Sequence, residues 1–174
     1  GGDETVTDAC CRFLTEWAPE SQPLALIVGL LLPHCPFICP PDLYRYYYDR
    51  IEVPRLPDGY LSRLHPAARA YRQRREFDGL TDEQVRVARA AYYGLVEYAD
   101  RLIGRVLETL ARTRLAENTI LAYVSDHGDM AGEHRIWTKS NFYEGSVGVP
   151  MIWSWPGHFS EGRTVNQVTS LLDI

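Results

Sequence analysis

The sequence is short of three features that would set it apart from ordinary globular proteins: an excess of basic residues, a long apolar run and a cysteine framework. Lys and Arg number 18 against 23 Asp and Glu, which gives a net charge of −5 and no basic excess for binding nucleic acid. The longest apolar run, Leu24–Leu32, is interrupted by Gly29 and falls well below the ~20 residues that cross a bilayer. We therefore expect neither a nucleic-acid nor a membrane partner.

Cysteine is also too scarce for a disulfide scaffold, with 4 residues in 174. Cys10 and Cys11 are adjacent, and Cys35 and Cys39 flank a Pro-Phe-Ile stretch, so neither pair has the spacing of a zinc site. We expect free thiols, as in a reducing compartment such as the cytoplasm. The hydrophobic (45%) and charged (24%) fractions are those of an average globular domain and exclude disorder and coiled coils.

Apolar residues at helical spacing predict two helices. Within residues 4–17 they recur every three or four positions, which indicates one buried helix face. Thr81 and Gln84 form a capping box that predicts the start of a longer helix. The apolar face of this second helix consists of Ala88, Tyr92, Leu95, Ala99, Leu102, Val106 and Leu110. Gly94 and Gly104 lower its helix propensity, so we expect a close contact or a kink there.

Three apolar segments predict strands: Leu24–Leu31, Thr119–Val124 and Met151–Trp155. The first is apolar throughout, as in a parallel sheet buried on both faces. A long excursion over 35–79 has a turn or two of helix only at 43–48, and loops of this length are usually lids or substrate surfaces. Strand, helix and strand in this order predict a right-handed crossover unit. The predicted fold class is α/β, a mostly parallel sheet with flanking helices.

Polar residues gather where two of these strands end, which is where open parallel sheets bind ligands. The second strand is followed by Asp126 and His127, and Gly128 permits the sharp turn that brings a carboxylate and an imidazole onto one metal ion. Two ligands alone cannot hold a metal. For an isolated pair, the alternative is a helix cap at Asp126 and a loop hydrogen bond from His127. The first strand ends at Pro33 and His34.

The whole run Val124–Gly145 resembles the sulfatase family of the alkaline phosphatase superfamily. In that family a Ser-Asp-His-Gly-Asp strand end is followed by Gly-Glu, Trp, Lys and Tyr-Glu. The matching residues here are Ser125 to Asp129, Gly132, Glu133, Trp137, Lys139, Tyr143 and Glu144. Upstream, Pro33–Phe37 is similar to the family's Pro-His-x-Pro-Phe element, and Val149–Ile152 is similar to its next strand. The resemblance implies an alkaline-phosphatase-like fold over residues 1–174.

The resemblance also implies roles for four residues. Asp126 and His127 correspond to ligands of a divalent cation, calcium in most members, and the imidazole nitrogen leaves manganese or magnesium as alternatives. Lys139 corresponds to the lysine that holds a sulfate oxygen. His34 corresponds to the histidine that contacts the ester and protonates the leaving alkoxide. The alternatives are a solvated surface lysine and a strand-end histidine bonded to the backbone. The implied substrate is a small sulfate ester.

Two elements of the family are absent from the sequence. The first is the formylglycine nucleophile, made from the first residue of a Cys/Ser-x-Pro-x-Arg motif, and the second is a pair of aspartates that completes the metal site. Cys39 comes nearest, with Pro41 in place but Leu43 where arginine is required. We therefore interpret residues 1–174 as a partial, incomplete sulfatase catalytic domain whose nucleophile region and C-terminal region lie outside this chain.

Three functions remain open at this point. The leading one is hydrolysis of a sulfate ester by the whole protein. The second is hydrolysis of a phosphonate or phosphate ester on the same scaffold, and the third is a non-catalytic sulfatase-like domain. In each case we expect the isolated chain to be inactive, to bind divalent cations weakly and to be prone to association through exposed sheet edges.

Overall fold

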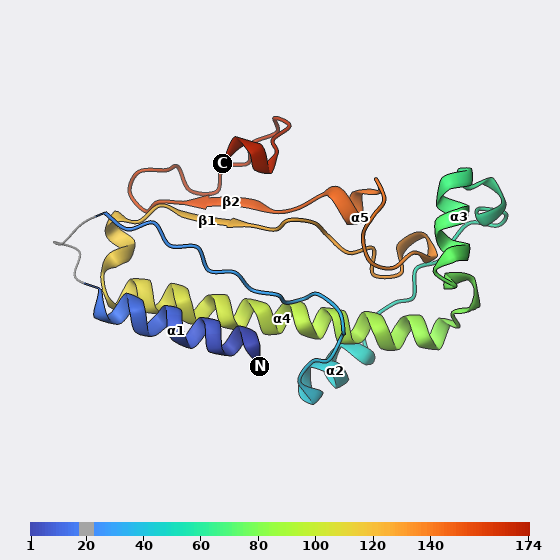
Figure 1. Ribbon diagram of the computed structural model, residues 1–174, viewed down its shortest axis with the longest axis horizontal. Helices are drawn as coiled ribbons and strands as arrows, with labels where there is room; N and C mark the ends of the chain where they lie inside the picture. Colours follow the sequence, from blue (N-terminus) through green and yellow to red (C-terminus); the bar gives the residue numbers. More distant parts are fainter. Residues whose placement is uncertain (18–22) are drawn as a thin grey trace. The chain divides into compact units, whose positions relative to one another are not determined.

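The computed structural model describes residues 1–17 and 23–174 and divides the chain into two compact units. Unit 1 comprises Gly1–Leu31, Ala99–Asp126 and Pro150–Ile174, and unit 2 comprises Leu32–Tyr98 and His127–Val149. Each unit therefore combines segments that are distant in the sequence. The longest helix, α4 (Asp82–Arg112), contributes its first half to unit 2 and its second half to unit 1 (Figure 1).

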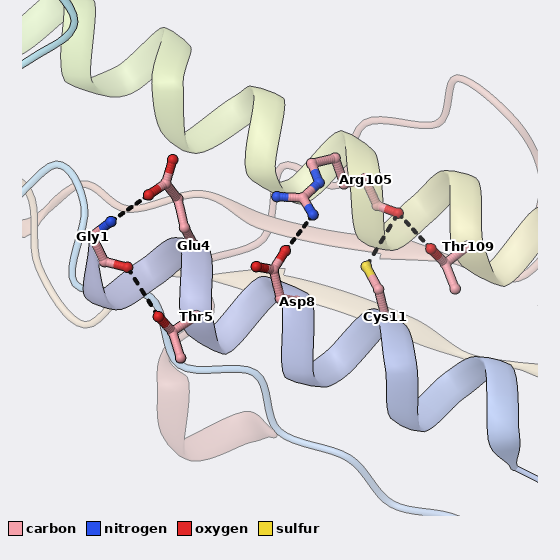
Figure 2. Close-up of polar contacts among 7 residues, drawn as sticks. All are labelled: Gly1, Glu4, Thr5, Asp8, Cys11, Arg105 and Thr109. Carbon is pink, nitrogen blue, oxygen red and sulfur yellow. Dashed lines mark hydrogen bonds and ion pairs between the residues drawn. The ribbon is translucent and has the colours of Figure 1, made fainter.

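In unit 1, α1 (Gly2–Glu16) lies alongside the second half of α4, which confirms the predicted first helix (Figure 1). Cys10 and Leu14 point one turn apart toward Leu110, and the three form a buried cluster. Polar contacts run along the same seam: Asp8 pairs with Arg105, whose carbonyl oxygen accepts from Cys11 Sγ at 3.6 Å (Figure 2). The helix pair is therefore held by an apolar cluster with polar contacts at its edge.

The sheet of unit 1 has two strands among the described residues, β1 (Leu121–Val124) and β2 (Met151–Ser154). They match two of the predicted strands, but they pair antiparallel, with Leu121 opposite Ser154 and Val124 opposite Met151. The prediction of a mostly parallel sheet is therefore wrong for the strands present. The third predicted strand, Leu24–Leu31, is extended but forms no strand, because none of the described segments pairs with its backbone.

Unit 2 contains α2 (Pro41–Tyr48), α3 (Pro66–Arg74) and α5 (Glu144–Val147) besides the first half of α4. α2 confirms the short helix expected near residues 43–48. α3 was not predicted, although Pro66 occupies its first position and His65 Nδ1 accepts from the Ala67 amide at 3.2 Å. The excursion that the sequence assigned to a lid or substrate surface is thus largely folded. Short 3-10 turns in the two units are Leu61–Arg63, Phe77–Gly79, Leu115–Asn118, Glu133–Arg135 and Leu171–Asp173.

The predicted start of α4 is confirmed by both bonds of its capping box. The Thr81 amide donates to Gln84 Oε1 at 2.9 Å, and the Gln84 amide donates to Thr81 Oγ1 at 3.2 Å. A close contact also exists at Gly94, where an added Cβ would lie 2.7 Å from Cys39 Sγ. At Gly104 the space is open. Gly94 therefore lets α2 and its preceding turn approach the helix.

The core of unit 2 consists of two apolar clusters that meet on the 127–149 segment. Tyr71 packs with Met130 and Ile136, and Val85 packs with Ala131 and Trp137. Partly buried residues around them are Phe37, Val53, Phe77, Leu80, Ala88, Tyr92 and Tyr143. The segment that carries the sequence motif is therefore packed against α3 on one side and α4 on the other.

All four cysteines are free, as the sequence predicts, and burial raises the pKa of the Cys10 and Cys39 thiols. Across the ranges that the structure describes, no helix combines the length and apolarity that a membrane crossing requires.

Candidate active site around Lys139

Three of the four predicted site residues meet in unit 2. Lys139 Nζ lies 3.1 Å from His34 Nε2 and 2.7 Å from His127 Nε2. The two imidazole rings face this ammonium with their centroids 6.2 Å apart and their planes at 65°. Lys139 is the only lysine in the 174 residues, so every other long basic side chain is an arginine. A compact ammonium fits between two imidazoles, where a planar guanidinium would need more room.

Backbone carbonyls set the protonation pattern of both histidines. His34 Nδ1 lies 2.7 Å from the Cys35 carbonyl oxygen, and His127 Nδ1 lies 2.8 Å from that of Gly128. Because a carbonyl oxygen can only accept, each Nδ1 carries the hydrogen and each Nε2 directs a lone pair at Lys139. The ammonium therefore donates to both rings. An ammonium has three N–H groups, and the two rings take two of them, which leaves one N–H without a hydrogen bond to the described residues.

The loop that carries Lys139 is closed by one carboxylate. Asp129 Oδ1 accepts from the amides of Ala131 at 2.8 Å and Thr138 at 3.1 Å. Across the same loop, the Met130 amide donates to the Thr138 carbonyl at 3.0 Å. These bonds join the two ends of the loop immediately before Lys139, so they fix where its backbone leaves the core.

Gly128 is required here for a reason that differs from the one the sequence suggested. Its φ is not in the left-handed region, but an added Cβ would lie 2.2 Å from the Gly145 carbonyl oxygen. The Gly128 amide also donates to the Ser146 carbonyl at 2.9 Å. Close backbone approach, rather than a sharp turn, explains the glycine.

The segment that carries His34 is anchored by an aromatic residue. Phe37 lies with its ring centroid 5.5 Å from that of Tyr92 on α4 and 5.9 Å from that of Trp137. Trp137 is buried and stands two residues before Lys139. These edge-on and tilted ring contacts join the His34 turn to the Lys139 loop, although the two segments are more than a hundred residues apart.

Other residues of the motif have packing roles. The His134 ring stacks on Tyr143, with centroids 4.3 Å apart, and its Nδ1 contacts the Tyr60 hydroxyl at 2.6 Å. Burial, with a hydrogen bond to Tyr143, raises the pKa of Tyr60. Glu133 pairs with the buried Arg89 at 3.3 Å. These contacts hold the loop and do not face Lys139.

The backbone around Lys139 is strained. Five residues between 131 and 140 that are not glycine have left-handed φ angles: Ala131 (45°), His134 (53°), Arg135 (56°), Thr138 (64°) and Ser140 (75°). Such residues cost about 1–3 kcal/mol each and persist where the surroundings determine them. One surrounding residue, Tyr71 on α3, was missed by sequence reasoning, because a lone tyrosine in an arginine-rich stretch belongs to no motif. Its hydroxyl donates to the Lys139 carbonyl at 2.6 Å.

Asp126, the fourth predicted residue, directly precedes His127 and is exposed in unit 1. A carboxylate followed by an imidazole is a donor pair that suits a divalent cation, but His127 Nε2 lies 2.7 Å from Lys139 Nζ here and would have to leave that contact to bind one. Calcium takes six to eight ligands, and no group of three or more His, Cys, Asp or Glu side chains forms a metal site in the described ranges. The two side chains are therefore of a kind that such a cation binds, and two ligands are fewer than it requires.

The fold is similar to that of known structures. The structure is similar to the crystal structure of phosphonate monoester hydrolase of Agrobacterium radiobacter, with a TM-score of 0.74, 26% identity, and coverage of 87% of this chain and 32% of that chain. This is the alkaline-phosphatase-like α/β fold. The family model "Sulfatase" matches residues 2–174, and the chain belongs to the sulfatase family.

Two curated relatives agree with this assignment. Arylsulfatase K of Canis lupus familiaris is 32% identical over 99% of this chain and 35% of its own length. Choline-sulfatase of Rhizobium meliloti is 34% identical over 88% of this chain and 31% of its own length. The chain thus spans about a third of the length of the relatives it matches.

Proposed function

We propose that this chain supplies the anion-binding and leaving-group side of an enzyme that hydrolyses sulfate esters. The observation that supports this most directly is the position of Lys139 Nζ between His34 Nε2 and His127 Nε2. The proposal covers a whole protein of which these 174 residues form a partial catalytic domain.

Lys139 binds the sulfate group in this proposal. Its ammonium donates two N–H groups to imidazoles, and the third is available to a sulfate oxygen. Negative charge moves onto oxygen as the S–O bond breaks, and a fixed ammonium stabilises that charge most where water is partly excluded. Lys139 is partly buried, which favours this role over that of a solvated surface lysine.

His34 is proposed as the general acid. Its Nδ1–H is held by the Cys35 carbonyl, so the ring is oriented with Nε2 toward the site. In the arrangement described, Nε2 accepts from Lys139, so it would first have to take up a proton before it could deliver one to the leaving alkoxide; histidine gains and loses a proton near neutral pH. The backbone hydrogen bond of His34 thus orients the ring and does not take it out of the site.

Asp126 and His127 are proposed to hold a divalent cation, with calcium as the first candidate and manganese or magnesium as alternatives because one donor is nitrogen. When bound, such a cation supplies Lewis acidity toward a sulfate oxygen. The Gly128 carbonyl keeps the His127 proton on Nδ1, so Nε2 is the nitrogen that would bind the cation, in exchange for its present contact with Lys139. The nucleophile is proposed to come from a Cys/Ser-x-Pro-x-Arg element elsewhere in the whole protein.

The sole lysine makes the proposal directly testable. Labelling with ¹³C,¹⁵N-lysine gives one set of lysine side-chain signals, which report Lys139 alone during a titration with inorganic sulfate. We expect sulfate to shift these signals, and we expect Lys139→Ala to weaken sulfate binding at least about tenfold, measured by calorimetry. Lys139→Arg keeps the charge and should also bind more weakly, because the guanidinium fork does not fit between the rings.

Arg114→Ala is the matched control for net charge. Arg114 is exposed and pairs with Glu117 at 2.9 Å within its own turn. This variant should bind sulfate as the unsubstituted chain does. Equal sulfate affinity in Lys139→Ala and Arg114→Ala would contradict the proposed role of Lys139.

A second candidate function is hydrolysis of a phosphonate or phosphate ester. The TM-score of 0.74 to a phosphonate monoester hydrolase favours it. Tighter binding of methylphosphonate than of sulfate in the same titration, and faster hydrolysis of an aryl phosphate than of an aryl sulfate by the whole protein, would select this function. A coding sequence without any Cys/Ser-x-Pro-x-Arg element would instead select the non-catalytic domain.

A further inference from the structure

The backbone on both sides of Lys139 is in the left-handed region, with φ of 64° at Thr138 and 75° at Ser140. Threonine is β-branched, and its side chain makes this conformation a genuine outlier. A lysine between two such residues does not hold its position through local preference. Its surroundings must determine it.

The Tyr71 hydroxyl contacts both Thr138 and Lys139 at this turn. It donates to the Lys139 carbonyl at 2.6 Å and lies 3.1 Å from Thr138 Oγ1, so one oxygen serves both residues. Since the single hydroxyl hydrogen goes to the carbonyl, the Thr138 hydroxyl donates to Tyr71. The Tyr71 ring is buried against Met130 and Ile136, which fixes the hydroxyl.

The neighbouring residue on α3 supports the same loop farther back. Arg72 is buried, and its guanidinium donates to the carbonyls of His134, at 2.8 Å, and Arg135. Those two residues are also left-handed. Asp78 pairs with the same guanidinium. Two consecutive residues of α3 therefore contact the strained loop at two separate places.

We propose that Tyr71 is a positioning residue for Lys139: its hydroxyl holds the left-handed turn 138–140 and thereby keeps the ammonium between His34 and His127. The consequence for sulfate binding rests on the proposed function, whereas the effect on the turn does not. The excursion over 35–79, which the sequence assigned to a lid or substrate surface, thus includes the residue that supports Lys139.

Tyr71→Phe tests the proposal, because it removes only the hydroxyl and keeps the ring in the core. In the chain labelled at its sole lysine, we expect the Lys139 signals and the imidazole ¹⁵N signals of His34 and His127 to shift without ligand. Inorganic sulfate should bind about tenfold more weakly. The Thr138 and Ser140 backbone shifts should move away from left-handed values.

Tyr47→Phe is the matched control, since the Tyr47 hydroxyl donates to Glu97 at 2.9 Å within the same unit. It should leave the signals of Lys139 and both histidines unchanged. If Tyr71→Phe and Tyr47→Phe give the same Lys139 signals, the proposal is overturned.

A rescue separates positioning from general structural support. Glycine adopts positive φ without a steric penalty. Thr138→Gly therefore removes the backbone strain at residue 138, so that the turn no longer needs the Tyr71 hydroxyl to hold it. The double variant Tyr71→Phe/Thr138→Gly should bring the Lys139 signals and the sulfate affinity back to within about twofold of the unsubstituted chain. A double variant that remains as weak as Tyr71→Phe would show that the hydroxyl does not act through the turn.

Two further outcomes are decisive. If Tyr71→Phe does not fold, the proposal is tested on the unsubstituted chain by measuring exchange of the Tyr71 hydroxyl proton. A slowly exchanging proton with nuclear Overhauser contacts to Thr138 and Lys139 supports the proposal, and the absence of such a proton overturns it. If the unsubstituted chain binds no sulfate but Tyr71→Phe still moves the signals of residues 138–140, the positioning role stands and the proposed function fails.

Discussion

The core beneath the Lys139 loop in unit 2 and the strands of unit 1 differ in how far their apolar residues are covered. In unit 2, Ile136 is completely buried and Met130 and Trp137 nearly so. In unit 1, Trp153 and Ile152 on β2 are about half exposed, and Ile27 is 96% exposed. Unit 2 therefore has a finished core beneath the Lys139 loop, whereas the strands of unit 1 present apolar side chains at the surface of this chain. Substitutions of the same kind should consequently have very different effects in the two units.

The largest difference is expected between Ile136→Ala and Ile152→Ala. Ile136 is 0% exposed and packs in a cluster with Tyr71 and Met130, so its truncation leaves a cavity and should cost about 3–4 kcal/mol of unfolding free energy. Ile152 is 55% exposed, and its truncation should cost less than about 1 kcal/mol. Urea unfolding followed by circular dichroism measures both. Equal losses would mean that the cores of the two units are equally complete.

Two glycine substitutions should differ in sign. Gly128→Ala places a Cβ 2.2 Å from the Gly145 carbonyl oxygen, and because the obstacle is backbone, we expect a loss of about 2–3 kcal/mol and displacement of the Lys139 signals. Gly104→Ala meets nothing within 4 Å inside α4 and should raise stability by up to about 1 kcal/mol. Thermal unfolding midpoints give the sign of each change. A Gly128→Ala chain with an unchanged midpoint would show that the 128–145 approach can open without cost.

Two ion pairs sharpen the same comparison. Asp78→Asn in unit 2 leaves the charge of Arg72, which is 3% exposed, without its carboxylate, and should cost about 1–2 kcal/mol, since Asp78 itself is partly hydrated. Asp8→Asn in unit 1 breaks the pair with Arg105 at the surface and should change stability little (Figure 2). Urea midpoints at low and high salt distinguish them: the Asp8 effect should vanish in salt, and the Asp78 effect should persist. If high salt also abolished the loss of stability in Asp78→Asn, the Arg72 guanidinium would be as hydrated as a surface residue.

The smallest effect is expected at Glu117, in the 3-10 turn Leu115–Asn118 that follows α4. Its hydrogen bond from Arg114 lowers the pKa of the carboxyl, so the ionised form favours the folded state. This contribution is present above the unfolded pKa of about 4.3 and is lost as the pH falls through the folded value. Glu117→Gln should therefore lower stability slightly above about pH 4.5, including near pH 7, and leave it unchanged at lower pH, where the carboxyl of the unsubstituted chain is protonated. A difference in stability that is largest in acid and disappears toward neutral pH would contradict this sign.

Local sequence signals predicted the helices well and the sheet poorly. The capping box at Thr81 and the apolar spacing of residues 4–17 act within a few turns, and α1 and α4 confirmed them. A strand depends on a partner elsewhere in the chain. The run Leu24–Leu31 is as apolar as any strand, yet without a paired neighbour it forms none, and the antiparallel pairing of β1 and β2 could not be inferred from apolarity.

The candidate site divides in the same way. His34, His127 and Lys139 stand in motif positions, so a resemblance sufficed to select them, and the structure places them together. Tyr71 acts through a hydroxyl that reaches a backbone carbonyl 68 residues away. No spacing rule encodes such a contact, because it depends on how α3 packs on the loop.

The left-handed run at residues 131–140 also constrains how this segment can be redesigned. A library randomised at Thr138 and Ser140 and selected for stability alone should enrich glycine and asparagine, since both adopt positive φ readily. Each such replacement would make the turn independent of α3. The present residues instead join the lysine to a helix more than sixty positions away, so changes in α3 and in the loop should be tolerated in pairs and not one at a time.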